Sequence, residues 1–156
     1  MIYWFTGQPS HGKTVLADKL HSYLQEKSDK KIFRIDGDEM RELFTNKDYT
    51  INGRVENIGT AQRISHYLHN QGYDVVVSLV SPYIDQREDF KKLIGDDIIE
   101  FYIHCNEPRE RDHFQAIAYK PPVDNHVNID TTENDPDESF GEILAALKYR
   151  NINFIV

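Results

Sequence analysis

The chain has 156 residues and a formal net charge of −8, from 18 basic and 26 acidic side chains. This length fits a single domain over residues 1–156, and the mean hydropathy of −0.62 with no long apolar run excludes a membrane span. The acidic balance argues against nucleic acid as a partner, and a single cysteine with no signal-like N-terminus makes the cytoplasm the expected location.

Apolar, β-rich runs alternate with helical patterns along the chain. In chain order, the expected elements are strand Ile2–Thr6, helix Lys13–Lys27, strand Lys31–Ile35, helix Ile58–Gln71, strand Asp74–Val80, helix Asp85–Ile94, strand Ile98–His104, helix Pro108–Ala118, strand Val127–Ile129 and helix Pro136–Arg150. The apolar tail Tyr149–Val156 is compatible with an edge strand, over Ile152–Val156, or with a homodimer contact, and the sequence leaves both open.

Several of these strands are apolar almost throughout, as in Val75–Val77, which is typical of a sheet covered on both faces. The alternation of strand and helix predicts an α/β fold of three layers with a mainly parallel central sheet. In such sheets ligands bind at the carboxyl ends of the strands. Residues that carry chemistry are therefore expected at those ends.

The first strand is followed by the sequence G-Q-P-S-H-G-K-T, which satisfies the phosphate-loop pattern G-x-x-x-x-G-K-[ST] between a strand and a helix. The backbone N–H groups of such a loop bind the phosphates of ATP, the lysine reaches the β and γ phosphates, and the last hydroxyl ligates Mg²⁺. The alternative is a chance match in a turn. The candidate ATP-binding residues are Gly7, Gln8, Pro9, Ser10, His11, Gly12, Lys13 and Thr14, with the His11 side chain expected to point outward.

The second strand ends in Asp36-Gly37-Asp38. Two carboxylates at a strand's carboxyl end suit phosphoryl transfer, because one can accept a proton from the attacking hydroxyl while the other holds Mg²⁺. The alternative is a turn in which an aspartate caps a helix that begins near Glu39. With Lys13, these aspartates are the candidate catalytic residues, and Thr14 and Asp36 are the candidate metal ligands.

Four motifs together resemble the adenylylsulfate kinases. They are W-F-T-G at 4–7 before the phosphate loop, I-D-G-D-E-M-R at 35–41, R-V-E-N-I at 54–58 and S-L-V-S-P-Y at 78–83. The order and the separations are similar to those of the family, and four motifs are more specific than one. The resemblance covers about the first 90 residues closely, with a weaker match over Tyr119–Thr131.

The resemblance implies a P-loop kinase that phosphorylates the 3′-hydroxyl of adenosine 5′-phosphosulfate (APS). It also implies the acceptor site, which would contain Asp38, Arg41, Tyr49, Arg54, Asn57, Ser81, Pro82 and Tyr83. Tyr49 stands where the family has a Phe that stacks on the acceptor base. Taken without the resemblance, the arginines suit a solvated surface, Tyr49 suits a packing aromatic, and Ser81–Tyr83 suits a strand end.

The chain also departs from the family pattern. Gly59-Thr60 and Ile84 stand where the family has arginines, and residues 106–118 lack the family's G-L-Y-K-K-A and G-F-T-G stretches. Arg109 and Arg111 remain in this shortened lid, where either can cover the transferred phosphoryl group or pair with neighbouring acids. Two alternatives therefore stay open: a kinase for another nucleotide-linked acceptor, and a non-catalytic ATP-binding paralogue.

Overall fold

The computed structural model describes residues 1–107 and 115–150 of the chain. Its elements are β1 (Ile2–Thr6), α1 (Lys13–Lys27), β2 (Ile32–Asp36), α2 (Gly37–Leu43), α3 (Ile51–Asn70), β3 (Asp74–Ser78), α4 (Ile84–Ile94), a 3-10 turn (Gly95–Asp97), β4 (Ile98–His104), β5 (Val127–Asp130) and α5 (Pro136–Tyr149). Arg109, Arg111 and the expected edge strand over 152–156 lie outside the described residues. The helix expected over 108–118 is not helical in its described part, residues 115–118.

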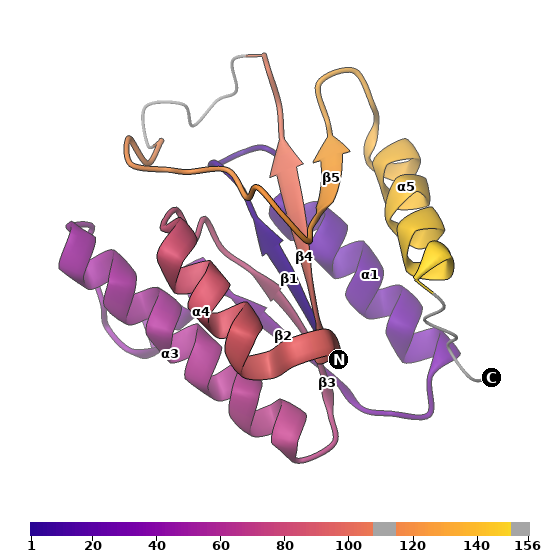
Figure 1. Cartoon of the computed structure of the whole chain (residues 1–156), viewed down its shortest axis with the longest axis horizontal. Helices are drawn as coiled ribbons and strands as arrows, with labels where there is room; N and C mark the ends of the chain where they lie inside the picture. The colour runs from indigo at the N-terminus through magenta and orange to yellow at the C-terminus, as the bar shows by residue number, and fades with distance from the viewer. Residues whose placement is uncertain (108–114, 151–156) are drawn as a thin grey trace.

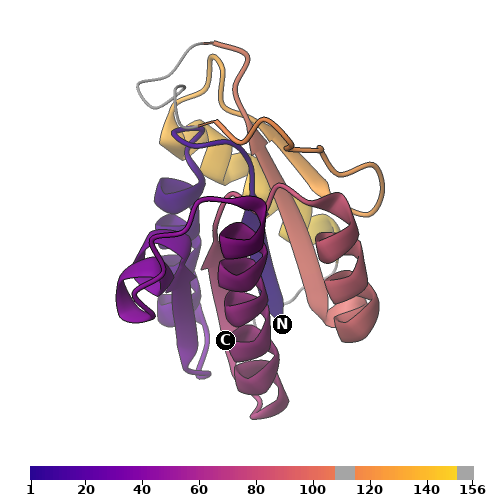
Figure 2. The ribbon, with the colours of Figure 1, turned by 90° about the vertical axis from the view of Figure 1, so that its left-hand side faces the viewer.

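The five strands form an all-parallel sheet in the order β2-β3-β1-β4-β5. Helices α1 and α5 cover one face and α3 and α4 cover the other (Figures 1 and 2). The predicted three-layer α/β fold with a parallel central sheet is thereby confirmed. None of the helices in the described residues is long and apolar enough to cross a bilayer.

The central strand β1 is buried along its whole length. Tyr3 and Phe5 pack in the core under α1 and α5, whereas Ile2 and Trp4 pack in the core under α3 and α4. This alternation follows from strand geometry, in which successive side chains point to opposite faces. The strand is therefore fixed from both sides, and so is the loop that follows it.

The prediction of α1 is confirmed at both ends, but α3 begins at Ile51, seven residues before the expected start. Its first turns carry few apolar residues, so hydrophobic periodicity does not reveal them. The hydroxyl of Thr50 accepts a hydrogen bond from the Gly53 backbone and caps the helix at this end. Further along, the Asn57 amide donates to Gly37 O at 3.3 Å and ties α3 to α2.

Candidate functional site

A cavity of about 310 Å³ opens at the carboxyl ends of β1, β2 and β3. This is the edge at which parallel sheets bind their ligands. The cavity is lined by three cations and two carboxylates, a net positive charge in a protein of net charge −8. Its lining residues are Pro9, Ser10, Lys13, Thr14, Asp36, Gly37, Asp38, Arg41, Tyr49, Arg54, Asn57, Ile58, Ser78, Leu79, Val80, Ser81 and Pro82.

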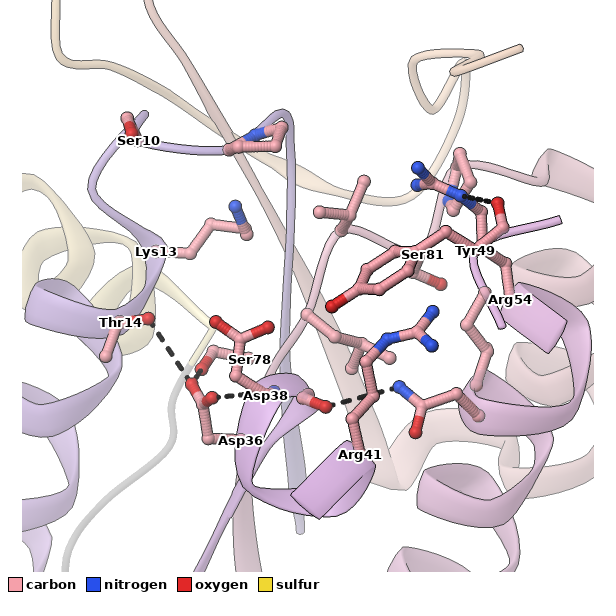
Figure 3. A pocket seen from close by; sticks show the side chains of 17 residues that line it. Ser10, Lys13, Thr14, Asp36, Asp38, Arg41, Tyr49, Arg54, Ser78 and Ser81 are labelled. Carbon is pink, nitrogen blue, oxygen red and sulfur yellow. Dashed lines mark hydrogen bonds between the residues drawn. The ribbon is translucent and has the colours of Figure 1, made fainter. Parts of the chain in front are cut away.

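The phosphate loop connects β1 to α1 along one wall of this cavity (Figure 3). Gly7 has φ 149°, and a Cβ at this position would lie 2.0 Å from the carbonyl oxygen of Ile103, so the loop can pass β4 only with glycine. The Lys13 ammonium donates to Gln8 O at 2.7 Å. This contact keeps the lysine over the concave side of the loop, where a phosphate would replace the carbonyl as its partner.

The expectation that His11 points outward is wrong. The His11 side chain is buried, and its Nδ1 accepts a hydrogen bond from the Cys105 backbone N–H at 3.2 Å. The Thr131 hydroxyl also donates to His11 O at 2.9 Å. A buried N–H group needs an acceptor, and His11 supplies one to the chain that leaves β4. The histidine thus fixes the outer side of the loop to the ends of β4 and β5.

Asp36 occupies the end of β2, where it caps α2 and also contacts the phosphate loop and β3. Its Oδ1 accepts the Asp38 backbone N–H at 3.0 Å, which caps α2. Its Oδ2 accepts from the hydroxyls of Ser78 at 2.7 Å and Thr14 at 3.3 Å, and lies 3.5 Å from Arg34 Nη2. The capping alternative is therefore present, and the same carboxylate also joins the phosphate loop to β3.

Asp38 differs from Asp36 in its surroundings. The residue is exposed, and its carboxylate points from the start of α2 into the cavity on the side of Lys13 (Figure 3). A general base must reach the proton that it removes, and Asp38 faces the space that an acceptor would occupy. Of the two aspartates, Asp38 is therefore better placed to act on an acceptor hydroxyl, and Asp36 is better placed to organise the site.

The donors around Asp36 suit Mg²⁺. The hydroxyl of Thr14 and the carboxylate of Asp36 are hard oxygen donors within hydrogen-bonding distance of one another on the wall of the cavity. Mg²⁺ is usually held by one or two such side chains together with substrate phosphates. The predicted metal ligands thus fit the ion, which would neutralise charge on the phosphates when bound.

On the opposite wall, Tyr49 stands in the loop between α2 and α3 with 62% of its surface exposed. The guanidinium of Arg41 lies 4.1 Å from the centre of its ring and that of Arg54 lies 5.9 Å away (Figure 3). Tyr49 is therefore not a packing aromatic of the core. Arg41 also donates to Asp48 O at 2.8 Å, and hydrogen bonds from Thr50 hold the pKa of Asp48 below its usual value.

The remaining acceptor candidates divide into two groups. Asn57, Ser81 and Pro82 line the cavity, whereas Tyr83 does not and packs beside the core under α3 and α4. Ser81 is buried with φ 45°, a strained backbone for a residue other than glycine. Its Oγ has no hydrogen-bond partner among the described residues and lies on the cavity wall, where a bound group can supply one.

A second cavity of about 140 Å³ lies on the other side of the phosphate loop, between α1 and the β5–α5 connection. It is lined by Ser10, His11, Gly12, Val15, Leu16, Thr131, Asn134, Pro136 and Ser139. Sequence reasoning missed the last four of these, as well as Ser78, which bonds both Asp36 and Arg34. The only sequence signal for these residues is their position: Ser78 ends β3, Thr131 follows β5, and the others lie at or near the start of α5.

Comparison with known proteins identifies the family of the chain. The family model described as adenylylsulphate kinase matches residues 1–132 of the chain. The chain belongs to the adenylylsulfate kinase family. The resemblance in the four motifs is thereby confirmed, and as a family member the chain is a kinase.

Two relatives illustrate the range of this adenylylsulfate kinase family. An adenylyl-sulfate kinase of Pseudomonas aeruginosa is 29% identical over 94% of this chain and 85% of its own length. A cytidine diphosphoramidate kinase of Campylobacter jejuni is 27% identical over 87% of this chain and 81% of its own. The two relatives are similar to this chain to nearly the same degree, although their names give different acceptors.

Among solved structures, the Mycobacterium tuberculosis APS kinase in complex with AMPPNP and APS superposes with a TM-score of 0.79. It covers 94% of this chain and 96% of its own, at 21% identity. At this level of identity the likeness shows the fold. The fold is thus that of P-loop kinases, and the residues of the site must be argued from this chain.

Proposed function

We propose that the protein transfers the γ-phosphoryl group of ATP to the 3′-hydroxyl of adenosine 5′-phosphosulfate. The observation that carries this proposal is that one cavity brings Lys13, Asp36 and Asp38 together with Arg41 and Arg54. A phosphate loop with its lysine serves an ATP donor, and planar guanidinium groups suit phosphate-like anions on an acceptor. A kinase needs its ATP site and its acceptor site next to each other, and this cavity contains residues suited to both.

In the donor half, the phosphate loop binds the triphosphate and Lys13 moves from Gln8 O to the β and γ phosphates. Thr14 and Asp36 hold Mg²⁺. The second cavity, which is lined by both apolar and polar side chains, accommodates the nucleoside of the donor because it adjoins the outer side of the same loop. The buried hydroxyl of Ser139, which has no partner among the described residues, is available to that nucleoside.

In the acceptor half, Arg41 and Arg54 neutralise the phosphosulfate, and the exposed ring of Tyr49 stacks on the base. Asp38 accepts the proton of the attacking hydroxyl. The Ser81 hydroxyl on the cavity wall donates a hydrogen bond to the acceptor molecule.

A second acceptor class is favoured by a specific observation. The chain lacks the G-L-Y-K-K-A and G-F-T-G stretches, and one relative of similar identity is named for a cytidine diphosphate derivative. The protein would then phosphorylate the hydroxyl of another nucleotide-linked acceptor bound in the same cavity. The donor half is common to both candidates, so only the acceptor distinguishes them.

A coupled ADP-release assay over a small acceptor panel tests the proposal. The panel contains APS, adenosine 5′-phosphate and a cytidine diphosphate derivative, each with ATP and Mg²⁺. Turnover with APS alone is the expected result. Turnover only with the cytidine compound would establish the second class, and ATP binding without any turnover would identify a non-catalytic paralogue.

Substitution of Tyr49 by alanine is expected to raise the KM of the acceptor by about 5- to 150-fold, because stacking of a base on an aromatic ring contributes about 1–3 kcal/mol. The KM of ATP should change little, since Tyr49 lies on the wall opposite the phosphate loop. Initial rates measured against each substrate in turn check this. A matched control is Tyr67→Ala, which removes a similarly exposed ring from α3 outside the cavity.

A further inference from the structure

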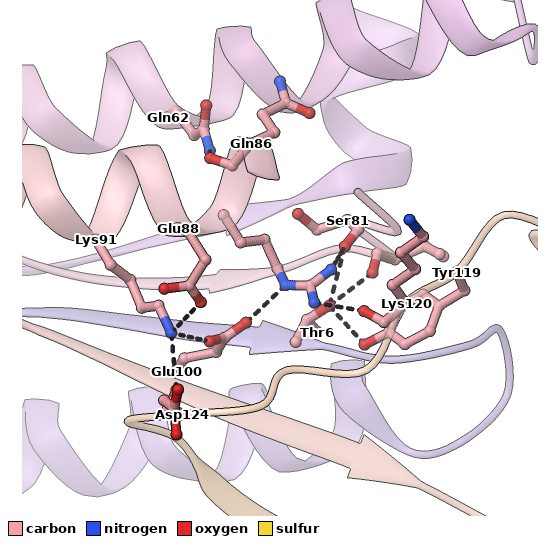
Figure 4. Close-up of polar contacts among 12 residues, drawn as sticks. Thr6, Gln62, Ser81, Gln86, Glu88, Lys91, Glu100, Tyr119, Lys120 and Asp124 are labelled. Atoms are coloured by element: carbon pink, nitrogen blue, oxygen red, sulfur yellow. Dashed lines mark hydrogen bonds and ion pairs between the residues drawn. The ribbon is translucent and has the colours of Figure 1, made fainter. Parts of the chain in front are cut away.

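Residues 116–124, which we call the strap, lead from the described end of the lid region towards β5. They cross the carboxyl ends of the strands beside the phosphate loop and α4 (Figure 1). Polar side chains from several elements bind the strap backbone along its length (Figure 4). These contacts involve neither the proposed metal ligands nor the proposed base.

One end of the strap is bonded to the phosphate loop through Gln8. The side-chain amide of Gln8 donates to Ala116 O at 3.0 Å, and its carbonyl oxygen accepts the Ala116 N–H at 2.9 Å. A primary amide is a side-chain group that can both donate to the C=O and accept from the N–H of one residue in this way. The first variable position of the phosphate-loop motif is therefore used to hold the strap.

The middle of the strap, at Lys120, is bonded to the Ser81–Pro82 wall of the acceptor half. The Lys120 N–H donates to Pro82 O at 2.9 Å. The buried guanidinium of Arg87 donates both to Lys120 O and to Ser81 O, at 2.5 Å each. The strap and the acceptor wall thus share one buried cation.

Between the attachments at Ala116 and Lys120, the strap is fixed to the sheet by Tyr119. Its hydroxyl lies 3.0 Å from that of Thr6, the last residue of β1, which also donates to Val80 O at 2.8 Å (Figure 4). Burial raises the pKa of Tyr119, so the hydroxyl stays protonated. The contacts from Gln8 to Ser81 therefore form a continuous path of hydrogen bonds.

We propose that Gln8 is a positioning residue that couples the donor loop to the acceptor wall through the strap. When a nucleotide orders the phosphate loop, Gln8 holds Ala116, and the ordered strap holds Lys120, Pro82 and Ser81 in place. Coupling of this kind is a free energy shared by two sites, and it requires a physical connection between them. This inference rests on the proposed function, because it assigns an ATP donor to the loop.

Hydrogen exchange at saturating AMPPNP tests the coupling without knowledge of the acceptor. In the wild-type protein we expect AMPPNP to slow exchange of the Ala116 and Lys120 amides by about 5- to 30-fold, within the usual range of coupling between sites. In Gln8→Leu, which keeps the backbone of the loop but removes both hydrogen bonds, the slowing should be lost. A role limited to stability would raise exchange equally with and without nucleotide.

Gln25→Leu provides the matched control, because it removes a side-chain hydrogen bond to Ile32 O far from the strap. It should leave the effect of AMPPNP on the strap unchanged. With the acceptor that turns over in the panel, Gln8→Leu should also raise acceptor KM more than ATP KM. Equal slowing by AMPPNP in wild-type protein and Gln8→Leu would overturn the coupling, whereas a wild-type protein that binds AMPPNP but phosphorylates nothing would overturn the proposed function alone.

Discussion

Substitution of Asp38 by asparagine is expected to lower kcat by about 10²- to 10⁴-fold, the usual contribution of a general base. Asparagine preserves the size of the side chain but cannot accept the proton of the acceptor hydroxyl. Binding of ATP should stay within a few-fold of wild type, because Lys13 and the loop N–H groups are untouched. Single-turnover kinetics and calorimetric titration with AMPPNP measure the two quantities separately.

Glu39→Gln is the control for this substitution. Glu39 is the adjacent exposed carboxylate on α2, and it does not line the cavity. It should retain wild-type turnover. An Asp38→Asn enzyme with unchanged kcat would show that the proton is accepted elsewhere, and the assignment of the base would have to be withdrawn.

Substitution of Glu100 by glutamine is expected to lower the free energy of unfolding by about 3–5 kcal/mol. Glu100 on β4 is 1% exposed and bonds Arg87 Nε and Lys91 Nζ, each at 2.7 Å (Figure 4). Both cations are themselves buried. Without this anion, Arg87 has no carboxylate partner among the described residues, and Lys91 keeps only the partly exposed Glu88. A neutral amide cannot compensate for the buried positive charges.

Glu88→Gln separates this effect from the loss of an ordinary ion pair. Glu88 also pairs with Lys91, at 2.6 Å, but its side chain is 35% exposed. Its removal should cost about 1 kcal/mol or less, because water screens exposed pairs. Urea unfolding monitored by circular dichroism compares the two variants, and equal losses would contradict a buried charge network around Glu100.

The sequence predicted the fold well where the hydrophobic pattern is clear. Helix α1 over Lys13–Lys27 was predicted with its bounds because its buried residues recur with the helical period. Strands β1 and β4 were predicted with their bounds because they are nearly continuous buried, β-prone runs. The early start of α3 at Ile51 escaped prediction, since a Thr50 cap and contacts with α2 stabilise it instead of an apolar face.

The site was predictable where short motifs carry it. The cavity brings together Lys13, Asp36, Asp38 and Arg54, which come from three separate motifs. Partners distant in sequence could not be inferred: Gln8 and Ala116 are 108 residues apart, and nothing local to either indicates the other. The inward direction of His11 likewise depends on Cys105, so a pattern limited to the loop gave the wrong orientation.

The position of β1 at the centre of the sheet also bears on how the protein is made. β1 pairs with β3 and β4, which begin only at Asp74 and Ile98. Ribosomes add about 5–20 residues per second, so β1 waits roughly 5 to 20 seconds for its second partner. Until β3 is made, its apolar residues have no strand to pair with. A nascent chain of this kinase should therefore depend on chaperones more than its small size suggests.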